Sequence, residues 1–285
     1  MKYNNPVLRG YADPDVLLYD GVYYLYATSY HIKDGYEVYS STDLQNWENH
    51  GNCMAPEPWG LKKGFWAPDV KEHNGKFYML ATVDGHLGLC MADSPLGPFV
   101  PQNGFLLEKT IDGHIFFDGE DMYIYYASWR EGHKYAIWGC KMNPDHLTPD
   151  MSTETMLIVA EEPYESGKSR IAEAPYMMTK DGKYYLTYSG SHFVSPIYCV
   201  AYAESDSPLG PFVKYEGNPI LVGDGETVTG TGHHCITTTV DKSEYIIVYH
   251  IHSKPNDAGY RDICVGGIRF TEKDGKTILE CEKPY

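Results

Sequence analysis

The sequence predicts an all-β protein folded as a five-bladed β-propeller, from its internal repeats, its turn residues and its composition. A polar turn followed by a Tyr-rich strand recurs five times, starting at residues 20, 74, 118, 181 and 241. Four of these turns are DG or NG, dipeptides that tolerate positive φ and favour tight hairpins. The chain has 26 Tyr and 28 Gly among 285 residues, a composition typical of short strands joined by turns.

Each repeat is longer than one hairpin. A short strand precedes every turn: DVLLY, DVKEH, HIFF, YMMT and CITTTV. A second motif, SPLGPFV, closes the segments that end at residues 100 and 213. Units of four strands and about 45 to 60 residues are typical of propeller blades. The alternative is a β-sandwich whose hairpins resemble one another by chance. The recurrence of SPLGPFV together with the hairpins argues against it. The stretch EEPYESGKSR (161–170) is expected to be a loop, and no linker divides the single predicted domain, 1–285.

Charge and cysteine content narrow the function classes. The formal net charge is −16, so neither a nucleic-acid-binding surface nor a membrane-binding one is expected. A neutral small-molecule substrate fits this charge better. The seven cysteines include no CxxC pair, which predicts free thiols in a reducing compartment. The N-terminal residues lack a signal-peptide pattern, which predicts a cytoplasmic protein, and the oligomeric state stays open.

Ionisable or aromatic side chains occur at similar depths before the five turns. They lie five to eight residues upstream: Asp13, Trp66 with Asp69, Asp112, Glu173 and His233. The innermost strands of a propeller surround its axis, so these side chains should converge at one mouth of the central funnel. Burying an unpaired carboxylate is costly, and several converging carboxylates therefore indicate a functional site.

Three carboxylates around a funnel suit inverting hydrolysis of a glycosidic bond. One carboxylic acid protonates the leaving oxygen, while a carboxylate on the other side activates water. The acid needs a raised pKa, which burial or a neighbouring negative charge supplies. Asp13, Asp112 and Glu173 are the predicted catalytic residues. From the residues alone, the same trio could instead hold a hard cation such as Ca²⁺.

These motifs resemble glycoside hydrolase family 43 over nearly the whole chain. NPVLRGYADPDV is similar to the segment that carries the family's catalytic base, an Asp followed by Pro. The resemblance assigns the base to Asp13, with Asp15 as the competing choice. TIDGHIFF resembles the segment whose Asp tunes and orients the acid, which implies Asp112, although Gly113 stands where the family often has Pro. IAEAPY resembles the general-acid segment and implies Glu173.

The resemblance also implies ligands around the carboxylates. WAPDV places Trp66 beside the pocket for sugar stacking, with core packing as the alternative. GYRD resembles a late segment whose Arg reaches a substrate hydroxyl, here Arg261. GTGHH resembles a stretch whose His lies near an axial cation. His233 is therefore the candidate metal residue, ahead of His234, for one possible Ca²⁺ or other divalent cation.

The resemblance implies an inverting exo-glycosidase that releases D-xylose, L-arabinose or both from short plant-polysaccharide fragments. An arabinanase or β-galactosidase of the same fold is the near alternative. A non-catalytic sugar-binding propeller and a metal-dependent phosphoesterase are alternatives from other classes.

Overall fold

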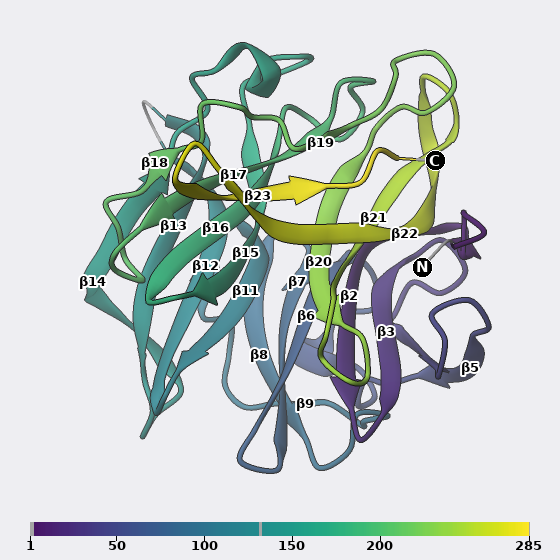
Figure 1. Cartoon of the computed structure of the whole chain (residues 1–285). Coiled ribbons are helices and arrows are strands. Elements are labelled where there is room, and N and C mark those ends of the chain that lie inside the picture. Colours follow the sequence, from purple (N-terminus) through teal and green to yellow (C-terminus); the bar gives the residue numbers. More distant parts are fainter. Residues whose placement is uncertain (1–2, 131–132, 285) are drawn as a thin grey trace.

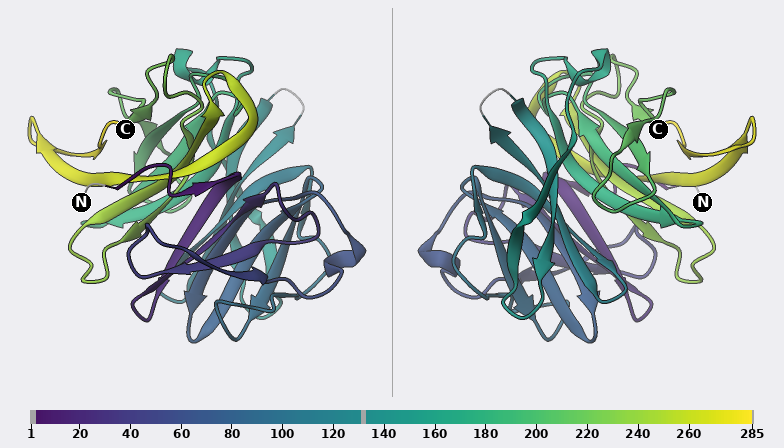
Figure 2. Two further views of the ribbon diagram at one scale, coloured as in Figure 1. Left: turned by 90° about the vertical axis from the view of Figure 1, so that its right-hand side faces the viewer. Right: turned by 90° about the vertical axis from the view of Figure 1, so that its left-hand side faces the viewer.

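The computed structural model describes residues 3–130 and 133–284, which form five antiparallel sheets arranged around a common axis (Figures 1 and 2). The predicted five-bladed propeller is confirmed. Five hydrophobic clusters of buried side chains fill the wedges between neighbouring sheets, so the core is divided among the blade interfaces. In these two segments, no helix is long and apolar enough to span a membrane.

The first three blades follow the chain in order, each beginning at the axis. Blade 1 consists of β2 (Tyr11–Tyr19), β3 (Val22–Ser29), β4 (Glu37–Ser41) and β5 (Glu48–Asn52). A 3₁₀ turn, η1 (Pro58–Gly60), leads to blade 2, with β6 (Phe65–His73), β7 (Lys76–Val83), β8 (His86–Ala92), β9 (Val100–Pro101) and β10 (Leu107–Glu108). Blade 3 contains β11 (Thr110–Asp118), β12 (Asp121–Arg130), β13 (His133–Asn143) and β14 (Thr148–Ile158).

The last two blades differ at their outer edges. The 3₁₀ turn η2 (Pro163–Glu165) precedes blade 4, with β15 (Ala172–Lys180), β16 (Lys183–Gly190), β17 (Cys199–Ser205), β18 (Val213–Lys214) and β19 (Leu221–Val222). Blade 5 contains β20 (Gly232–Thr238), β21 (Tyr245–Lys254), β22 (Asp257–Lys273), β23 (Lys276–Cys281) and the N-terminal strand β1 (Leu8–Arg9).

The N-terminal strand closes the ring. β1 pairs with the first half of β22 at Ile263 and Asp262, while β23 pairs with the second half. The buried Asp262 strengthens this junction, because its carboxylate accepts the Gly10 N–H at 3.0 Å and the Ser253 hydroxyl at 2.7 Å. The first and last strands of the chain, β1 and β23, are consequently both part of blade 5 and lie on the same side of the molecule (Figures 1 and 2).

Every innermost strand contains a β-bulge near its start. The pairing of β2, β6, β11, β15 and β20 with the next strand shifts register there. One residue of each bulge has positive φ: Asp13, Ala67, Asp112, Ala174 and His233. Such bulges bend a strand and redirect its side chains. Equivalent positions of all five blades therefore face the same mouth of the axis.

A second set of equivalent residues, two positions further along, ties each blade to the next. The carboxylate of Asp15 accepts the Val70 N–H of blade 2, and Asp69 accepts the Ile115 N–H of blade 3, both at 2.8 Å. His114 Nε2 then accepts the Met177 N–H of blade 4. The Tyr176 hydroxyl donates to the Ile236 carbonyl of blade 5, and the Cys235 sulfur contacts the main chain of Val16 in blade 1.

Candidate active site

The structure brings Asp13, Asp112, Glu173, His233 and Arg261 together at the bulge end of the inner strands. All but His233 are buried, and the His233 side chain is only 13 % exposed. Asp13, Asp112 and His233 occupy the positive-φ positions of blades 1, 3 and 5, whereas Glu173 directly precedes that position in blade 4. The convergence predicted from the repeat is therefore present.

Asp13 has several donors and a cation around it. Its Oδ1 lies 2.7 Å from Nη1 of Arg261 and 3.3 Å from Nδ1 of His233, and its Oδ2 accepts the Thr28 hydroxyl at 2.7 Å. Burial opposes ionisation, but Arg261 and His233 outweigh it and hold the pKa of Asp13 well below its usual range. Asp13 is consequently an anion throughout the neutral range.

Glu173 has the opposite electrostatic environment. Burial raises its pKa to about 7, and the negative charge of Asp13 acts in the same direction. The Tyr198 hydroxyl donates to Glu173 Oε1 at 2.9 Å and Arg261 lies nearby, and both partly offset the increase. Glu173 therefore retains a proton close to neutral pH, as a general acid must.

Asp112 also has a raised pKa, of about 7. Burial is again the first cause, and the charges of Glu173 and Asp13 add to it against the opposing effect of His233. Asp112 Oδ2 accepts the Ala174 N–H at 3.1 Å, next to Glu173 in the chain. In blades 1, 2, 4 and 5, a side chain of the second strand accepts the corresponding N–H of the following blade. Ala127 occupies that position in blade 3 and cannot accept, so Asp112 takes this bond.

The two predicted alternatives, Asp15 and His234, have partners away from the mouth. Asp15 bonds the Val70 N–H and lies 3.2 Å from the Lys71 ammonium, an arrangement that joins blades 1 and 2. His234 Nε2 lies 2.7 Å from the Thr187 hydroxyl. The structure therefore places Asp13 and His233, and not these neighbours, among the converging carboxylates.

Trp66 lies at the same level on blade 2. It is paired with Thr82 just before the bulge of β6, as Glu173 is paired with Ser189 just before the bulge of β15. Its side chain is 43 % exposed, so it is not a core residue. This placement fits a stacking surface at the mouth, which stays a prediction.

The metal prediction rests on His233. Its Nδ1 lies between two carboxylates, 3.3 Å from Asp13 Oδ1 and 3.9 Å from Asp112 Oδ2. An axial cavity of about 20 Å³ lies nearby, lined by residues of all five inner strands. Within the described segments, no group of three or more His, Cys, Asp or Glu side chains is placed to hold a metal ion. The residues present do not fit a dedicated Ca²⁺ cage, which requires six to eight oxygen ligands.

Three residues of the site were missed by sequence reasoning. Tyr198 bonds Glu173, the Nδ1 of His250 accepts the Asp13 N–H at 3.2 Å, and the Tyr30 hydroxyl accepts the Arg261 Nε–H at 3.0 Å. His250 and Tyr198 stack with ring centroids 5.6 Å apart. His250 lies on β21 and could have been found from the repeat, because it pairs with Gly232 as Thr28 pairs with Ala12. Tyr198 and Tyr30 lie in loops between strands, where the repeat gives no register.

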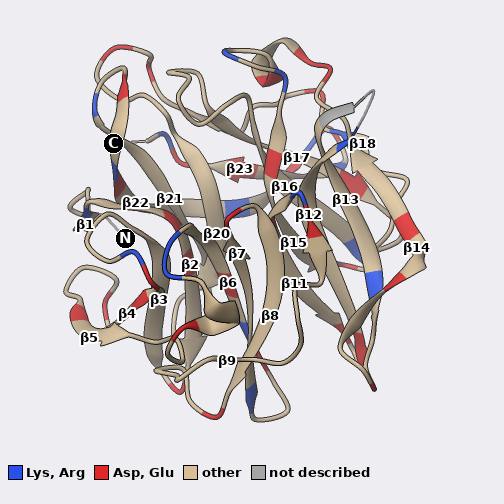
Figure 3. Cartoon of the chain, turned by 180° about the vertical axis from the view of Figure 1, so that it is seen from behind, with Lys and Arg blue, Asp and Glu red and all other residues tan. Residues whose placement is uncertain are grey.

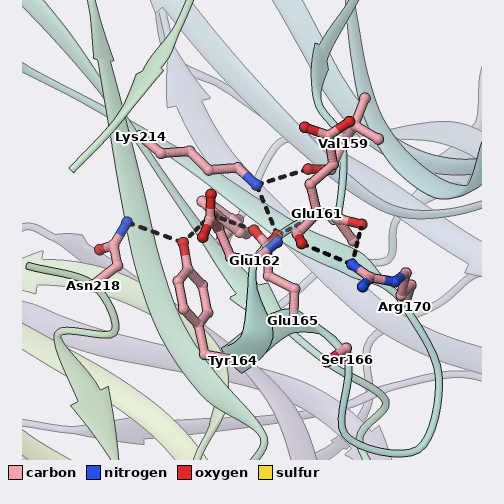
Figure 4. A network of polar contacts seen from close by, with 12 residues as sticks. Val159, Glu161, Glu162, Tyr164, Glu165, Ser166, Arg170, Lys214 and Asn218 are labelled. Carbon is pink, nitrogen blue, oxygen red and sulfur yellow. Dashed lines mark hydrogen bonds and ion pairs between the residues drawn. The ribbon is translucent and has the colours of Figure 1, made fainter. Parts of the chain in front are cut away.

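The loop that leads to Glu173 is anchored by a fully buried carboxylate, Glu165 of η2 (Figure 4). Its Oε2 accepts the N–H groups of Glu161 and Glu162 and lies 2.7 Å from the Lys214 ammonium. The Glu165 carbonyl accepts the Ile171 N–H at the start of β15. The stretch expected to be a simple loop is therefore a fixed support for the strand that carries Glu173.

Acidic side chains predominate over basic ones. Acidic residues number 39 against 23 basic ones, and in Figure 3 the basic positions are scattered over several blades. Arg130 of β12 and Glu154 of β14 form an ion pair at 2.5 Å across the intervening strand β13.

Comparison with known proteins gives the family. The model of glycosyl hydrolases family 43 matches residues 3–276. A β-D-galactofuranosidase of Aspergillus niger is 28 % identical, covering 95 % of this chain and 83 % of its own length. A xylosidase/arabinosidase of Bacteroides ovatus is 29 % identical, covering 84 % and 85 %. The crystal structure of a thermostable family-43 glycoside hydrolase is 35 % identical, with a TM-score of 0.87 and coverage of 99 % and 96 %. The repeats, the propeller and the converging carboxylates thus agree with the family match, and the chain belongs to glycoside hydrolase family 43.

Proposed function

We propose that the chain is an inverting exo-glycosidase that releases D-xylose, L-arabinose or both from short plant-polysaccharide fragments. The observation that carries the proposal is the contrast between two buried carboxyl groups in one site: Arg261 contacts Asp13 and holds its pKa low, whereas burial raises the pKa of Glu173. An anion and a protonated acid held together near neutral pH are the pair that inversion requires. The sugar assignment rests on the Bacteroides ovatus relative, which is named a xylosidase/arabinosidase.

In the proposed reaction, Asp13 removes a proton from water as the water oxygen bonds to the anomeric carbon. The glycosidic C–O bond breaks at the same carbon, and Glu173 gives its proton to the leaving oxygen. Inverting enzymes keep their two carboxyl groups about 6.5–9.5 Å apart to leave room for that water. Asp112 accepts the Ala174 N–H and so fixes the bulge beside the acid. Trp66 and Arg261 would contact the sugar.

The proposal is tested with 4-nitrophenyl β-D-xyloside and α-L-arabinofuranoside. The wild type should hydrolyse at least one, and Glu173→Gln and Asp13→Asn should each lose about 10²-fold or more of kcat/KM. Proton NMR of the first product should show the inverted anomer. A retained anomer would contradict the mechanism, and equal inactivity of wild type and Glu173→Gln would favour a sugar-binding propeller.

A second candidate is hydrolysis of galactofuranosides, because the Aspergillus niger relative carries that name. The same assay with 4-nitrophenyl β-D-galactofuranoside distinguishes it. Preference for this substrate over both pentosides would replace the sugar assignment and leave the roles of Asp13 and Glu173 intact. Faster cleavage of linear arabinan than of the aryl glycosides would indicate an arabinanase.

A divalent cation near His233 stays a proposal from the family resemblance. With too few protein ligands in the described segments, such an ion would be held largely by water. No step of the proposed reaction passes through it. Assays with EDTA and with added Ca²⁺ test it, since an ion that matters should change kcat/KM reversibly.

A cytoplasmic location is likewise proposed. All seven cysteines are free, and six are buried, which agrees with a reducing compartment. Fractionation of the source cells would test it.

A further inference from the structure

We infer that Tyr198 is a positioning residue that holds the carboxyl group of Glu173 so that its Oε2 edge faces the glycosidic oxygen. The inference rests on the proposed function, because it concerns the acid of that reaction. Tyr198 is fully buried in the loop before β17, and its hydroxyl donates to Glu173 Oε1 at 2.9 Å. With Oε1 as the carbonyl oxygen that accepts the phenol proton, Oε2 is the hydroxyl oxygen that carries the proton of the acid.

A directional chain of hydrogen bonds fixes Tyr198 as the donor. The His233 N–H donates to Ser189 Oγ at 2.8 Å, and the Ser189 hydroxyl bonds Tyr198. Burial, with the charge of Glu173, keeps the pKa of Tyr198 well above its usual value, so the phenol keeps its proton. The Ser189 hydroxyl accepts the main-chain N–H and donates its own proton to the phenol oxygen, which leaves the Tyr198 proton for Glu173 Oε1.

The ring of Tyr198 packs against Gly232 and His250. A Cβ at position 232 would lie 2.4 Å from the ring, so Gly232 leaves the space that the ring occupies. On another side the ring stacks on His250, at an interplanar angle of 13°. Gly232 is at the position in blade 5 where blade 4 has Glu173 and blade 2 has Trp66. Blade 5 contributes no side chain there, and the phenol from blade 4 fills the gap.

This arrangement has a chemical consequence. When Glu173 gives the proton on Oε2 to the leaving oxygen, it becomes a carboxylate with Oε1 still bonded to the phenol. A hydrogen bond to an ionised partner is stronger than one to a neutral partner. Tyr198 therefore stabilises the product form of the acid as well as its orientation. The benefit is largest for leaving groups that require full protonation.

The experiment compares Tyr198→Phe with wild type on two substrates that differ in leaving group, xylobiose and 4-nitrophenyl β-D-xyloside. On xylobiose, kcat/KM should fall about tenfold or more, the usual effect of losing a hydrogen bond to a charged group. On the aryl glycoside, whose leaving group needs little protonation, the loss should be clearly smaller. The alkaline limb of the kcat/KM profile should also move up by about one pH unit, because Glu173 loses a bond that favours its anion.

Tyr125→Phe is the matched control. Tyr125 is equally buried, and its hydroxyl donates to the Pro208 carbonyl at 2.9 Å, in the wedge between blades 3 and 4. Tyr125→Phe should reproduce any general cost of removing a buried phenol hydroxyl. It should leave the alkaline limb and the ratio of kcat/KM between the two substrates unchanged. Ser189→Ala is the second variant, should Tyr198→Phe fail to fold. Ser189→Ala removes the hydroxyl that bonds Tyr198 and so weakens Tyr198 as a donor to Glu173. The alkaline limb should therefore move up, by less than in Tyr198→Phe.

The outcomes separate the two proposals. A wild type that cleaves no glycoside refutes the proposed function. An active wild type with equal losses on both substrates and an unmoved alkaline limb in both Tyr198→Phe and Ser189→Ala overturns the positioning role alone. If the proposed function holds with another sugar, the same pair of leaving groups on that sugar is used.

Discussion

Asp13 and Glu173 are buried to the same extent, yet their surroundings shift their pKa values in opposite directions. The largest part of the difference comes from Arg261, whose guanidinium contacts Asp13 and is only near Glu173, and His233 acts on Asp13 in the same direction. Burial alone would raise both pKa values. Positive charge placed beside one of the two carboxyl groups thus separates a base from an acid.

This separation predicts the pH dependence of the wild type. Because Glu173 must be protonated and its pKa is about 7, kcat/KM should decline tenfold per pH unit above about pH 7. Asp13 stays ionised well below that pH, so the acidic limb should lie far from the alkaline one. A profile of kcat/KM from pH 4 to 9 measures both limbs. A rise in activity above pH 7 would be incompatible with Glu173 as the acid.

Substitution of Arg261 should move the other limb. In Arg261→Met the cation that lowers the pKa of Asp13 is absent, so this pKa should rise. The base is then protonated at higher pH, and the acidic limb should shift upward by one pH unit or more. Arg9→Met, which removes an exposed Arg at the ring closure, is the control and should leave both limbs in place. An unmoved acidic limb would mean that Arg261 is not the group that keeps Asp13 ionised.

At the scale of elements, the site depends on how β15 is held at its start. Glu165 fixes the preceding loop through two main-chain N–H groups, the Tyr188 hydroxyl and Lys214. Lys214 lies on β18, an outer strand of the same blade. The inner and outer edges of blade 4 are therefore connected through one buried carboxylate just before Glu173.

We expect Lys214→Met to lower the free energy of unfolding by about 2–3 kcal/mol, because it leaves the fully buried Glu165 carboxylate without its cation. The value is below the usual range for buried pairs since the Lys214 side chain is 21 % exposed. Denaturant titration measures it. Lys183→Met, which breaks only exposed pairs, should change stability by less than about 1 kcal/mol. Equal effects of the two variants would show that Glu165 gains little from Lys214.

At the scale of the whole molecule, the ring is closed beside the catalytic base. β1 ends at Arg9, Gly10 bonds Asp262, and Asp13 follows three residues later. Arg261, the neighbour of Asp262 in β22, contacts Asp13 from the other side of the same junction. The contact between the start of the chain and β22 therefore both closes the propeller and positions Asp13.

Asp262→Ala should lower the free energy of unfolding by about 2–3 kcal/mol, since the Gly10 N–H and the Ser253 hydroxyl lose a buried acceptor. It should also reduce kcat/KM, because both residues next to the junction contribute to the base. Arg9→Ala removes the exposed partner of Asp262 and should cost less than about 1 kcal/mol. Thermal unfolding and the glycoside assay check both variants. An equal loss of stability in Arg9→Ala would mean that the Arg9–Asp262 ion pair, and not the two hydrogen bonds, stabilises the junction.

The repeat in the sequence was sufficient for the number of blades and for the residues on the inner strands. Asp13, Asp112 and His233 were found because the hairpin turns supply a common register. Ring closure was not predictable, since β1 is two residues long and pairs with residues 253 and 255 positions away in the sequence. Tyr198 was also missed, because a loop residue's direction depends on packing against Gly232 and His250. A repeated sequence pattern predicts the face of a strand on which a side chain lies, whereas the contacts of a loop residue depend on the tertiary structure.

The five bulges also have a consequence for redesign. In two of them the left-handed position holds Ala, at residues 67 and 174, a conformation that Asn, Asp and Gly adopt more readily. These two alanines stand where the other blades carry Asp13, Asp112 and His233. The five bulges therefore give the funnel five positions of equivalent backbone conformation, three of which carry a polar side chain. At Ala67 and Ala174 the backbone already has the conformation that Asn or Asp adopts readily, so these are the two bulge positions at which a further polar side chain would suit the local main chain.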